Sequence, residues 1–268
     1  MINLMLLTAD PVFAAKAQDA GVDRIFLDLE FINKIERQQG RNTYISPYSL
    51  EDIPPLRRVL DTAHLLVRVN PIHPHSKTEI DRVIEAGADI LMLPMVVDRD
   101  DVERFIDMVG GRARTCPMIE TAQAMARLDD IIEVNGIDEL FIGLNDLHIS
   151  LGLSFLFEPL SGGLVDYMAQ KIHARGIPFG FGGMGKMGEG LLPAEAILEE
   201  HYRLGSSSVI LSRTFRNENQ AEPKEVDLPL EIRKIREKET LFETYGAKEF
   251  EENRAFVKDC VEKIVAGK

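Results

Sequence analysis

Short hydrophobic runs alternate with amphipathic segments from one end of the chain to the other. Each run is almost continuously apolar, as expected for parallel strands that are covered on both faces. The segments between them have helical spacing, as in residues 98–109, where Asp98 is expected to cap the helix, and in residues 193–204. The pattern predicts eight strands, at residues 2–7, 24–29, 65–70, 90–96, 115–119, 139–143, 178–182 and 208–211.

Eight strands separated by helices favour a closed (β/α)8 TIM barrel over a doubly wound sheet. The length of 268 residues is close to that of one such barrel. A doubly wound nucleotide-binding sheet would place a glycine-rich turn after its first strand, whereas residues 8–11 are Thr-Ala-Asp-Pro. We therefore predict an α/β fold in which residues 1–215 form a barrel catalytic domain.

Residues 216–268 continue past the minimal barrel as a polar linker and two helical patterns. Each pattern carries one apolar stripe, the first formed by Ile232, Ile235, Phe242 and Tyr245, and the second by Phe250, Val257, Val261 and Ile264. Such stripes need a partner surface. We expect a C-terminal helical extension that packs on its own barrel or on a neighbouring subunit, and the sequence leaves both open.

Composition narrows the choice of partner and compartment. A formal net charge of -13 argues against nucleic acid and anionic membranes as partners, since an acidic surface repels both. The two cysteines, Cys116 and Cys260, lie far apart, which fits a reducing compartment. No apolar run approaches the length of a membrane span, and the N-terminal run has no basic flank. We expect a cytoplasmic protein.

Two of the predicted strands are followed by acids. Glu120 follows the run that ends at Ile119, and Asp146 follows the run that ends at Leu144. Because consecutive parallel strands end at the same face of a barrel, we expect the two carboxylates to converge. Two carboxylates together with waters suit a hard cation such as Mg²⁺. The alternative is that each acid only caps the helix that follows it.

Other polar residues stand at the predicted strand ends. Asp28 and Glu30 end the second strand, and Arg68 stands near the end of the third. A guanidinium fork suits a carboxylate or a developing enolate oxygen, although a salt bridge from Arg68 to Glu30 or Glu120 is the structural alternative. A glycine-rich stretch with Lys186 follows the seventh strand, and Arg213 follows the eighth. Together they could hold an anion; the alternative is that the glycines only allow close packing.

Five strings, in this order and spacing, resemble the HpcH/HpaI aldolase and citrate lyase β-subunit family: GVDRIFLDLE, LLVRVN, GADILMLPMV, MIETAQAM and GIDELFIGLNDLHISLG. The resemblance covers roughly residues 8–215. It implies a barrel of metal-dependent carbon–carbon lyases that act on 2-keto acids or acyl-CoA thioesters. It also implies a homo-oligomer, a trimer or a hexamer.

The resemblance implies roles for particular residues. Glu120 and Asp146 would bind Mg²⁺ or Mn²⁺, and Arg68 would contact the keto or enolate oxygen. Gly143 and Asn145, in the same motif as Asp146, would line the substrate site.

One position departs from the family pattern. Pyruvate aldolases of the family carry a histidine directly after the strand-2 glutamate, and this chain has Phe31 there. Acid–base work would then fall to another group, for which the candidates are Glu30, His73, His75, His148 and a water at the metal site. The basic residues Lys34, Arg37 and Arg41 resemble the substrate- or CoA-binding loop of the citrate lyase branch, the alternative being a solvated loop.

The leading hypothesis is a divalent-metal-dependent aldolase or lyase that works through a pyruvate-type enolate, with a 2-keto acid and an aldehyde or thioester as its small-molecule partners. A second hypothesis is a thioester lyase of the citryl- or malyl-CoA type. A third, from another class, is a barrel that binds a metabolite without catalysis.

Overall fold

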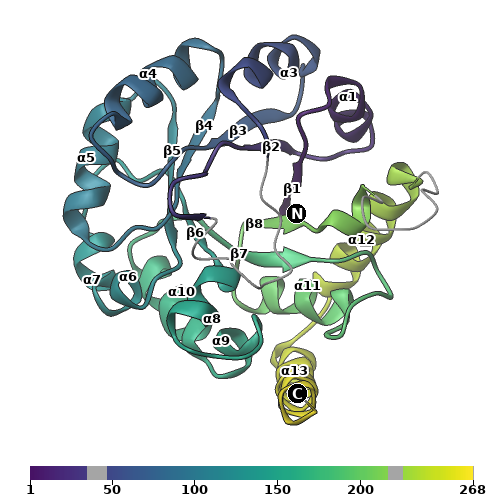
Figure 1. Ribbon diagram of the computed structural model, residues 1–268. Helices are drawn as coiled ribbons and strands as arrows, with labels where there is room; N and C mark the ends of the chain where they lie inside the picture. Colours follow the sequence, from purple (N-terminus) through teal and green to yellow (C-terminus); the bar gives the residue numbers. More distant parts are fainter. Residues whose placement is uncertain (35–46, 217–225, 268) are drawn as a thin grey trace.

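The fold is a closed barrel of parallel strands in chain order, with β1 paired to both β2 and β8 (Figure 1). The structure is a computed structural model that describes residues 1–34, 47–216 and 226–267. It confirms the predicted (β/α)8 barrel with C-terminal helices. The strands are β1 (Asn3–Leu7), β2 (Arg24–Asp28), β3 (His64–Arg68), β4 (Ile90–Leu93), β5 (Arg114–Ile119), β6 (Leu140–Ile142), β7 (Phe179–Met184) and β8 (Ser208–Leu211).

Helices form a layer around the strands, as Figure 1 shows. The α-helices are α1 (Pro11–Asp19), α3 (Ile53–Val59), α4 (Ser76–Glu85), α5 (Arg99–Val109), α6 (Ala122–Ala126), α7 (Leu128–Ile131), α8 (Leu144–Ser150), α9 (Glu158–Ser161), α10 (Leu164–Ala174), α11 (Ala194–Arg203), α12 (Leu228–Phe242) and α13 (Ala247–Ala266). Two short 3-10 helices, η1 (Leu50–Asp52) and η2 (Arg213–Phe215), precede α3 and follow β8.

Two strands, β3 and β4, end two or more residues earlier than their hydrophobic runs suggest. β3 ends at Arg68 and β4 at Leu93, whereas the runs continue to residues 70 and 96. After β4, Pro94 has no N–H to donate to a neighbouring strand, and Met95 adopts a left-handed φ of 56°. The chain therefore leaves the sheet here and contributes to the mouth of the barrel.

Asp98 caps α5 as the sequence predicts. Its side chain accepts a hydrogen bond from the backbone N–H of Asp101 at 3.2 Å, and the helix ends at Gly110 with a left-handed φ of 60°. The polar cap and the glycine end are signals local to the sequence, which is why the predicted and observed bounds of this helix agree.

A separate hydrophobic core fills the inside of the barrel. Its members are Met5, Phe26, Leu66, Ile90, Met92, Cys116, Met118 and Phe141. Below them, at the start of β2, the buried Arg24 pairs with Glu139 at 2.7 Å. Because side chains fill the interior in this way, a ligand of the barrel would bind at the C-terminal ends of the strands.

The C-terminal helices pack on their own barrel. α12 buries Ile232, Ile235 and Phe242, and the carboxylate of Glu239 accepts the backbone N–H of Ile2 at 2.6 Å. α13 lies along α11, where the Asn253 amide donates to the Ala196 carbonyl at 3.1 Å. The two apolar stripes thus find their partner surface within the same chain.

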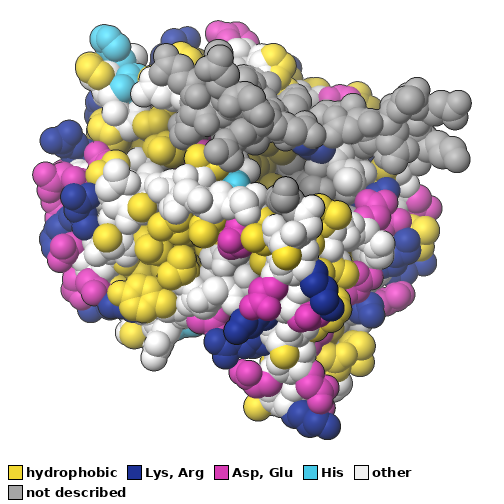
Figure 2. Space-filling model, turned by 60° about the horizontal axis from the view of Figure 1, so that its bottom comes forward, with side chains coloured by type: hydrophobic (Ala, Val, Ile, Leu, Met, Phe, Trp, Pro, Cys, Tyr) yellow, Lys and Arg dark blue, Asp and Glu magenta, His cyan; other side chains and the backbone are white. Residues whose placement is uncertain are grey.

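The outer surface is polar and mixed in charge. Figure 2 shows acidic and basic side chains interspersed over one face of the molecule, with hydrophobic side chains gathered between them. Among the described residues, no helix combines the length and the apolar character needed to cross a membrane.

Candidate active site

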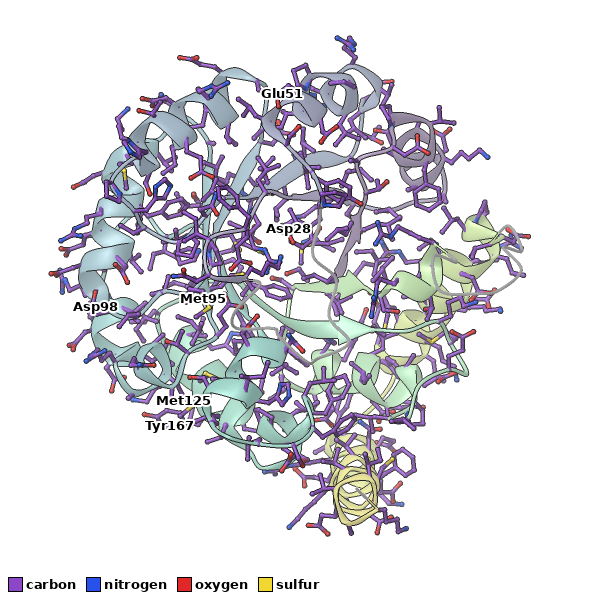
Figure 3. The ribbon with its side chains drawn as sticks, in the orientation of Figure 1. Asp28, Glu51, Met95, Asp98, Met125 and Tyr167 are labelled. Carbon is purple, nitrogen blue, oxygen red and sulfur yellow. The ribbon has the colours of Figure 1, made fainter. Side chains whose placement is uncertain are left out.

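A cavity of about 420 Å³ opens at the C-terminal ends of the strands. This volume is within the usual range of small-molecule sites, roughly 300–1,000 Å³. Figure 3 shows Asp28 inside the ring of strands, whereas Asp98 and Tyr167 lie in the outer layer of helices. The polar and small residues that line the cavity are Lys34, Arg68, Glu120, Gly143, Asn145, Asp146, Gly182, Gly183, Ser212, Arg213 and Arg216.

Glu120 is fixed in this cavity from two sides. It directly follows β5 and is 1% exposed. The backbone N–H of Met95, in its left-handed conformation, donates to Glu120 Oε1 at 2.8 Å. On the other side, a Cβ atom at Gly143 would collide with the carboxylate of Glu120. The bare backbone of Gly143 is therefore what makes room for this carboxylate.

The negative charge of Asp146 acts on Glu120. Burial, and after it the negative charge of Asp146, raise the pKa of Glu120 to about 8, although Arg68 opposes the shift. A divalent cation held by both carboxylates would remove the repulsion that Asp146 exerts on ionised Glu120. Among the described residues, no cluster of three or more His, Cys, Asp or Glu residues could hold a metal. The pair fits Mg²⁺ or Mn²⁺, because such ions accept one or two carboxylates and keep waters or substrate oxygens.

A second polar cluster joins the ends of β2 and β3. Asp28 accepts two parallel hydrogen bonds from Arg68, from Nε and from a terminal nitrogen, each 2.8 Å long. Lys34 Nζ donates to Asp28 at 2.5 Å. Glu30 lies behind both cations, 3.4 Å from Arg68 and 3.5 Å from Lys34. Arg68 thus forms a salt bridge with the acids at the end of β2, mainly with Asp28 and more distantly with Glu30.

The cluster keeps its charges in place. Burial by itself would raise the pKa of Asp28, but Arg68 and Lys34 outweigh burial and hold it well below its usual range. The pKa of Arg68 lies well above its ordinary value, because Asp28 and Glu30 outweigh the effect of burial. The Arg68 guanidinium also lies 5.5 Å from the ring centre of Phe26. Arg68 is therefore a permanent, oriented cation that faces the acid pair across the cavity.

The remaining predicted site residues fall into two groups. Gly143, Asn145 and Arg213 line the cavity together with the acid pair. Lys186 instead pairs with Glu189 at 3.0 Å, and it is not among the described residues that line the cavity. Arg37 and Arg41 lie outside the described residues.

The histidines are placed elsewhere. His73 lines a different cavity, of about 410 Å³, together with His75, and its ring lies 2.8 Å from the carboxylate of Glu79. The ring of His148 is buried and lies 3.2 Å from the carbonyl of Leu144, within its own helix. The structure thus does not bring these histidines into the cavity of Glu120. For His73 and His75, the reason is that the loop after β3 leads into α4, where the His73 ring contacts Glu79.

Comparison with known proteins identifies the family. A family model described as HpcH/HpaI aldolase/citrate lyase matches residues 2–158, more than half of the chain. The chain belongs to this family. The match includes Asp28, Arg68 and Glu120 at the ends of their strands and Asp146 in the first turn of α8.

Individual relatives of the HpcH/HpaI family are distant. A protein named 2-keto-3-deoxy-L-rhamnonate aldolase from Escherichia coli O17:K52:H18 is 24% identical over 212 residues, which cover 67% of this chain and 73% of the relative. Its namesake from Shigella boydii serotype 4 has the same figures.

Solved structures show the same fold. One is an HpcH/HpaI aldolase/citrate lyase family protein from Burkholderia cenocepacia J2315, with a TM-score of 0.63, 16% identity and coverage of 91% of this chain and 95% of that one. Another is a citrate lyase β subunit from M. tuberculosis, complexed with oxaloacetate and magnesium, with a TM-score of 0.59, 16% identity and coverage of 88% and 96%.

Two structural details could not be predicted from the sequence. Lys34 is expected in a substrate- or CoA-binding loop or in a solvated loop, whereas it is 3% exposed, pairs with Asp28 and lines the cavity. Met95 donates its backbone N–H to Glu120, and nothing in the local sequence predicts its left-handed conformation. Phe31, at the position of the family's histidine, is 65% exposed and lines the cavity of His73.

Proposed function

We propose that this chain is a divalent-metal-dependent carbon–carbon lyase that forms or cleaves the bond next to a 2-keto acid enolate, as an aldolase does. The observation that carries the proposal is the meeting of Glu120, Asp146 and Arg68 in one cavity. Membership of a family of aldolases and citrate lyases supports it.

The acid pair would hold Mg²⁺ or Mn²⁺, with Glu120 fixed by the Met95 N–H and given room by Gly143. When bound, the ion supplies Lewis-acid stabilisation of negative charge on a substrate oxygen. Asn145, which precedes Asp146 and lines the same cavity, would contact the substrate.

Arg68 supplies the second positive charge of the site. Its Nε and one terminal nitrogen are bonded to Asp28, so the orientation of the guanidinium is fixed before substrate binds. A fixed cation that faces the developing enolate oxygen stabilises it without reorganisation during the reaction. Glu30 contacts Arg68 and Lys34 and is proposed as the residue that positions both. The thioester alternative depends on Arg37 and Arg41, which lie outside the described residues. The relatives named 2-keto-3-deoxy-L-rhamnonate aldolase favour the keto-acid reaction, which is the one proposed.

We further propose a homo-oligomer in the cytoplasm. Leu241 on α12 and Phe256 on α13 are 44% and 48% exposed, which supports a subunit contact through the C-terminal helices.

Metal binding and cleavage of a 4-hydroxy-2-keto acid test the proposal together. We expect wild-type protein to bind Mn²⁺, followed by electron paramagnetic resonance, and to release pyruvate when Mg²⁺ or Mn²⁺ is present. Glu120→Gln and Asp146→Asn should each lose metal binding and pyruvate release while remaining folded. Lys186→Gln serves as the control, because Lys186 pairs with Glu189 outside the cavity. This variant should bind Mn²⁺ and release pyruvate like wild type. Metal binding that survives in both acid variants would contradict the assignment.

A further inference from the structure

Lys34 is a buried lysine in the same cavity as the acid pair. It is 3% exposed and lines the cavity together with Glu120 and Asp146. Lysine is almost never buried so fully unless acids pair with it, and here Asp28 and Glu30 do so. The cation is thus held inside the site by acids other than the proposed metal ligands.

The turn after β2 determines which side chain reaches the cavity. The side-chain oxygen of Asn70 accepts the backbone N–H groups of Phe31 and Ile32, each at 3.0 Å. Asn33 then adopts a left-handed φ of 58°, and the Lys34 N–H donates to the Phe31 carbonyl at 3.2 Å. This turn leaves Phe31 65% exposed and returns Lys34 to the strand end, so the lysine faces the site in place of residue 31.

Lys34 and Arg68 bind the same oxygen of Asp28. Lys34 Nζ donates to Asp28 Oδ2 at 2.5 Å, and a terminal nitrogen of Arg68 donates to it at 2.8 Å. An ammonium group has three N–H donors, and among the described residues the ion-pair partners of Lys34 are Asp28 and Glu30. One of the three donors is therefore left for a ligand, on the side of the cavity where Arg68 would bind the enolate oxygen.

The chemistry of the other side chains around the cavity leaves proton transfer to Lys34. Glu120 and Asp146 would be engaged by the metal, and arginine does not release its proton in a folded protein. The histidines weighed as acid–base groups lie outside this cavity. Among the described residues that line it, Lys34 is thus the one ionisable side chain that can both release and take up a proton while the metal stays bound.

We propose that Lys34 is the acid–base group of the reaction: its ammonium gives a proton to C3 of the enolate in the cleavage direction, and its amine takes that proton in the condensation direction. The inference rests on the proposed function and names the group that does the work Phe31 cannot do. Proton transfer by a positioned side chain typically contributes about 10²–10⁴-fold in rate, which sets the size of the effect expected when Lys34 is replaced.

Cleavage of a 4-hydroxy-2-keto acid then balances without any oxidant or reductant. The C4 hydroxyl loses its proton to water, and its oxygen becomes the carbonyl oxygen of the aldehyde. The C3–C4 bond breaks, and its electron pair passes to the keto acid, which becomes the enolate. A C–H bond forms at C3 with the proton from Lys34, which gives pyruvate. Lys34 recovers a proton from water, so no net proton is gained or lost.

Exchange of the pyruvate C3 protons with D2O, in the presence of Mg²⁺, measures this proton transfer directly. Lys34→Arg keeps a cation that can pair with Asp28 and Glu30, but a guanidinium does not release its proton. Exchange in this variant should fall by about a hundredfold or more, while Mn²⁺ binding is retained because the acid pair is intact. Lys77→Arg, at an exposed lysine paired with Asp81, should exchange like wild type. Exchange by Lys34→Arg at the wild-type rate would overturn the inference.

Rescue by external amines separates proton transfer from a structural role of the cation. Exchange by Lys34→Ala is measured with ethylamine or 2-fluoroethylamine at one pH and at equal concentrations of their ammonium forms, after subtraction of the exchange without protein. The two amines are close in size, and 2-fluoroethylamine is the weaker base, so more of it is present as free amine. Proton transfer predicts faster exchange with 2-fluoroethylamine. A cation that only holds Asp28 in place predicts equal rescue, which would overturn the inference.

Failure of this inference and failure of the proposed function give different results. Wild-type protein without metal-dependent exchange would refute the proposed function. Exchange in wild type that continues undiminished in Lys34→Arg would refute only the role of Lys34. Loss of Mn²⁺ binding in Lys34→Arg would also refute that role, since the lysine would then act on the metal site and not on the proton.

Discussion

At the scale of single residues, Asp28 organises the cationic side of the cavity. It accepts hydrogen bonds from Arg68 and from Lys34 while almost completely buried. The sequence places Asp28, Glu30 and Arg68 at strand ends, so their proximity is predictable from the barrel topology. Which acid pairs with Arg68 cannot be predicted from the topology, because Asp28 and Glu30 are both within its reach. The register of β2 and β3, which places Asp28 beside Arg68, decides between them.

We expect Asp28→Asn to damage both stability and turnover. The amide keeps the shape of the carboxylate but leaves two buried cations with one acid, and loss of one partner of a buried pair costs about 3 kcal/mol. Urea unfolding should show this loss, and pyruvate release should fall because Arg68 is no longer held. Asp81→Asn, which alters an exposed ion pair of α4, serves as the control. Equal effects of the two variants would refute the role of Asp28.

Gly143→Ala should reduce turnover more than stability. The new Cβ would strike the carboxylate of Glu120, which must then leave its position beside the Met95 N–H. A displacement of a reacting group by about 1 Å can cost roughly a hundredfold in rate. The matched control is Gly185→Ala, since a Cβ there has its nearest neighbours 4.0 Å away. Wild-type pyruvate release by Gly143→Ala would contradict the tight packing described here.

At the scale of elements, local signals explain what could be predicted and what could not. The cap of α5 at Asp98 and the apolar runs of the strands are local, and they are found where expected. The early end of β4 has one local cause, Pro94, and one that the sequence does not indicate, the left-handed conformation of Met95. The orientation of the loop that carries His73 depends on its contact with Glu79 of α4, so histidine content alone could not place it.

The packing of α11 on β7 predicts a pH dependence of stability. His201 of α11 is fully buried, its ring stacks on Phe181 with centres 3.7 Å apart, and burial lowers its pKa to about 3. The unfolded chain binds a proton at this histidine near its ordinary pKa of about 6.5, whereas the folded chain does not until about pH 3. The stability that neutral His201 confers is therefore present above pH 6.5 and is lost as the pH falls below it.

Between pH 7 and pH 5, this histidine alone should reduce the free energy of unfolding by about 2 kcal/mol. His201→Phe keeps the stacked ring and removes the titration, so its unfolding free energy should fall less over the same interval. Urea unfolding of both proteins at the two pH values measures the difference. Parallel losses in the two proteins would show that His201 does not cause the effect.

At the scale of the whole molecule, the C-terminal helices bury one face on the barrel and leave another exposed. Figure 1 shows α13 projecting beyond the ring of helices, away from α1. If the exposed Leu241 and Phe256 form a subunit contact, the double variant Leu241→Lys, Phe256→Lys should elute from size-exclusion chromatography as a smaller species than wild type. Val12→Lys, at an exposed position of α1, should elute like wild type. An unchanged elution volume of the double variant would place the contact elsewhere.

The central claim is that the cavity stabilises a 2-keto acid enolate with the help of a metal held by Glu120 and Asp146. Exchange of the pyruvate C3 protons with D2O, followed by NMR, measures enolate formation without knowledge of the true acceptor. We predict exchange in the presence of Mg²⁺ or Mn²⁺ that disappears on chelation and is absent in Glu120→Gln. Exchange that persists at an undiminished rate after chelation, or in Glu120→Gln, would contradict the account.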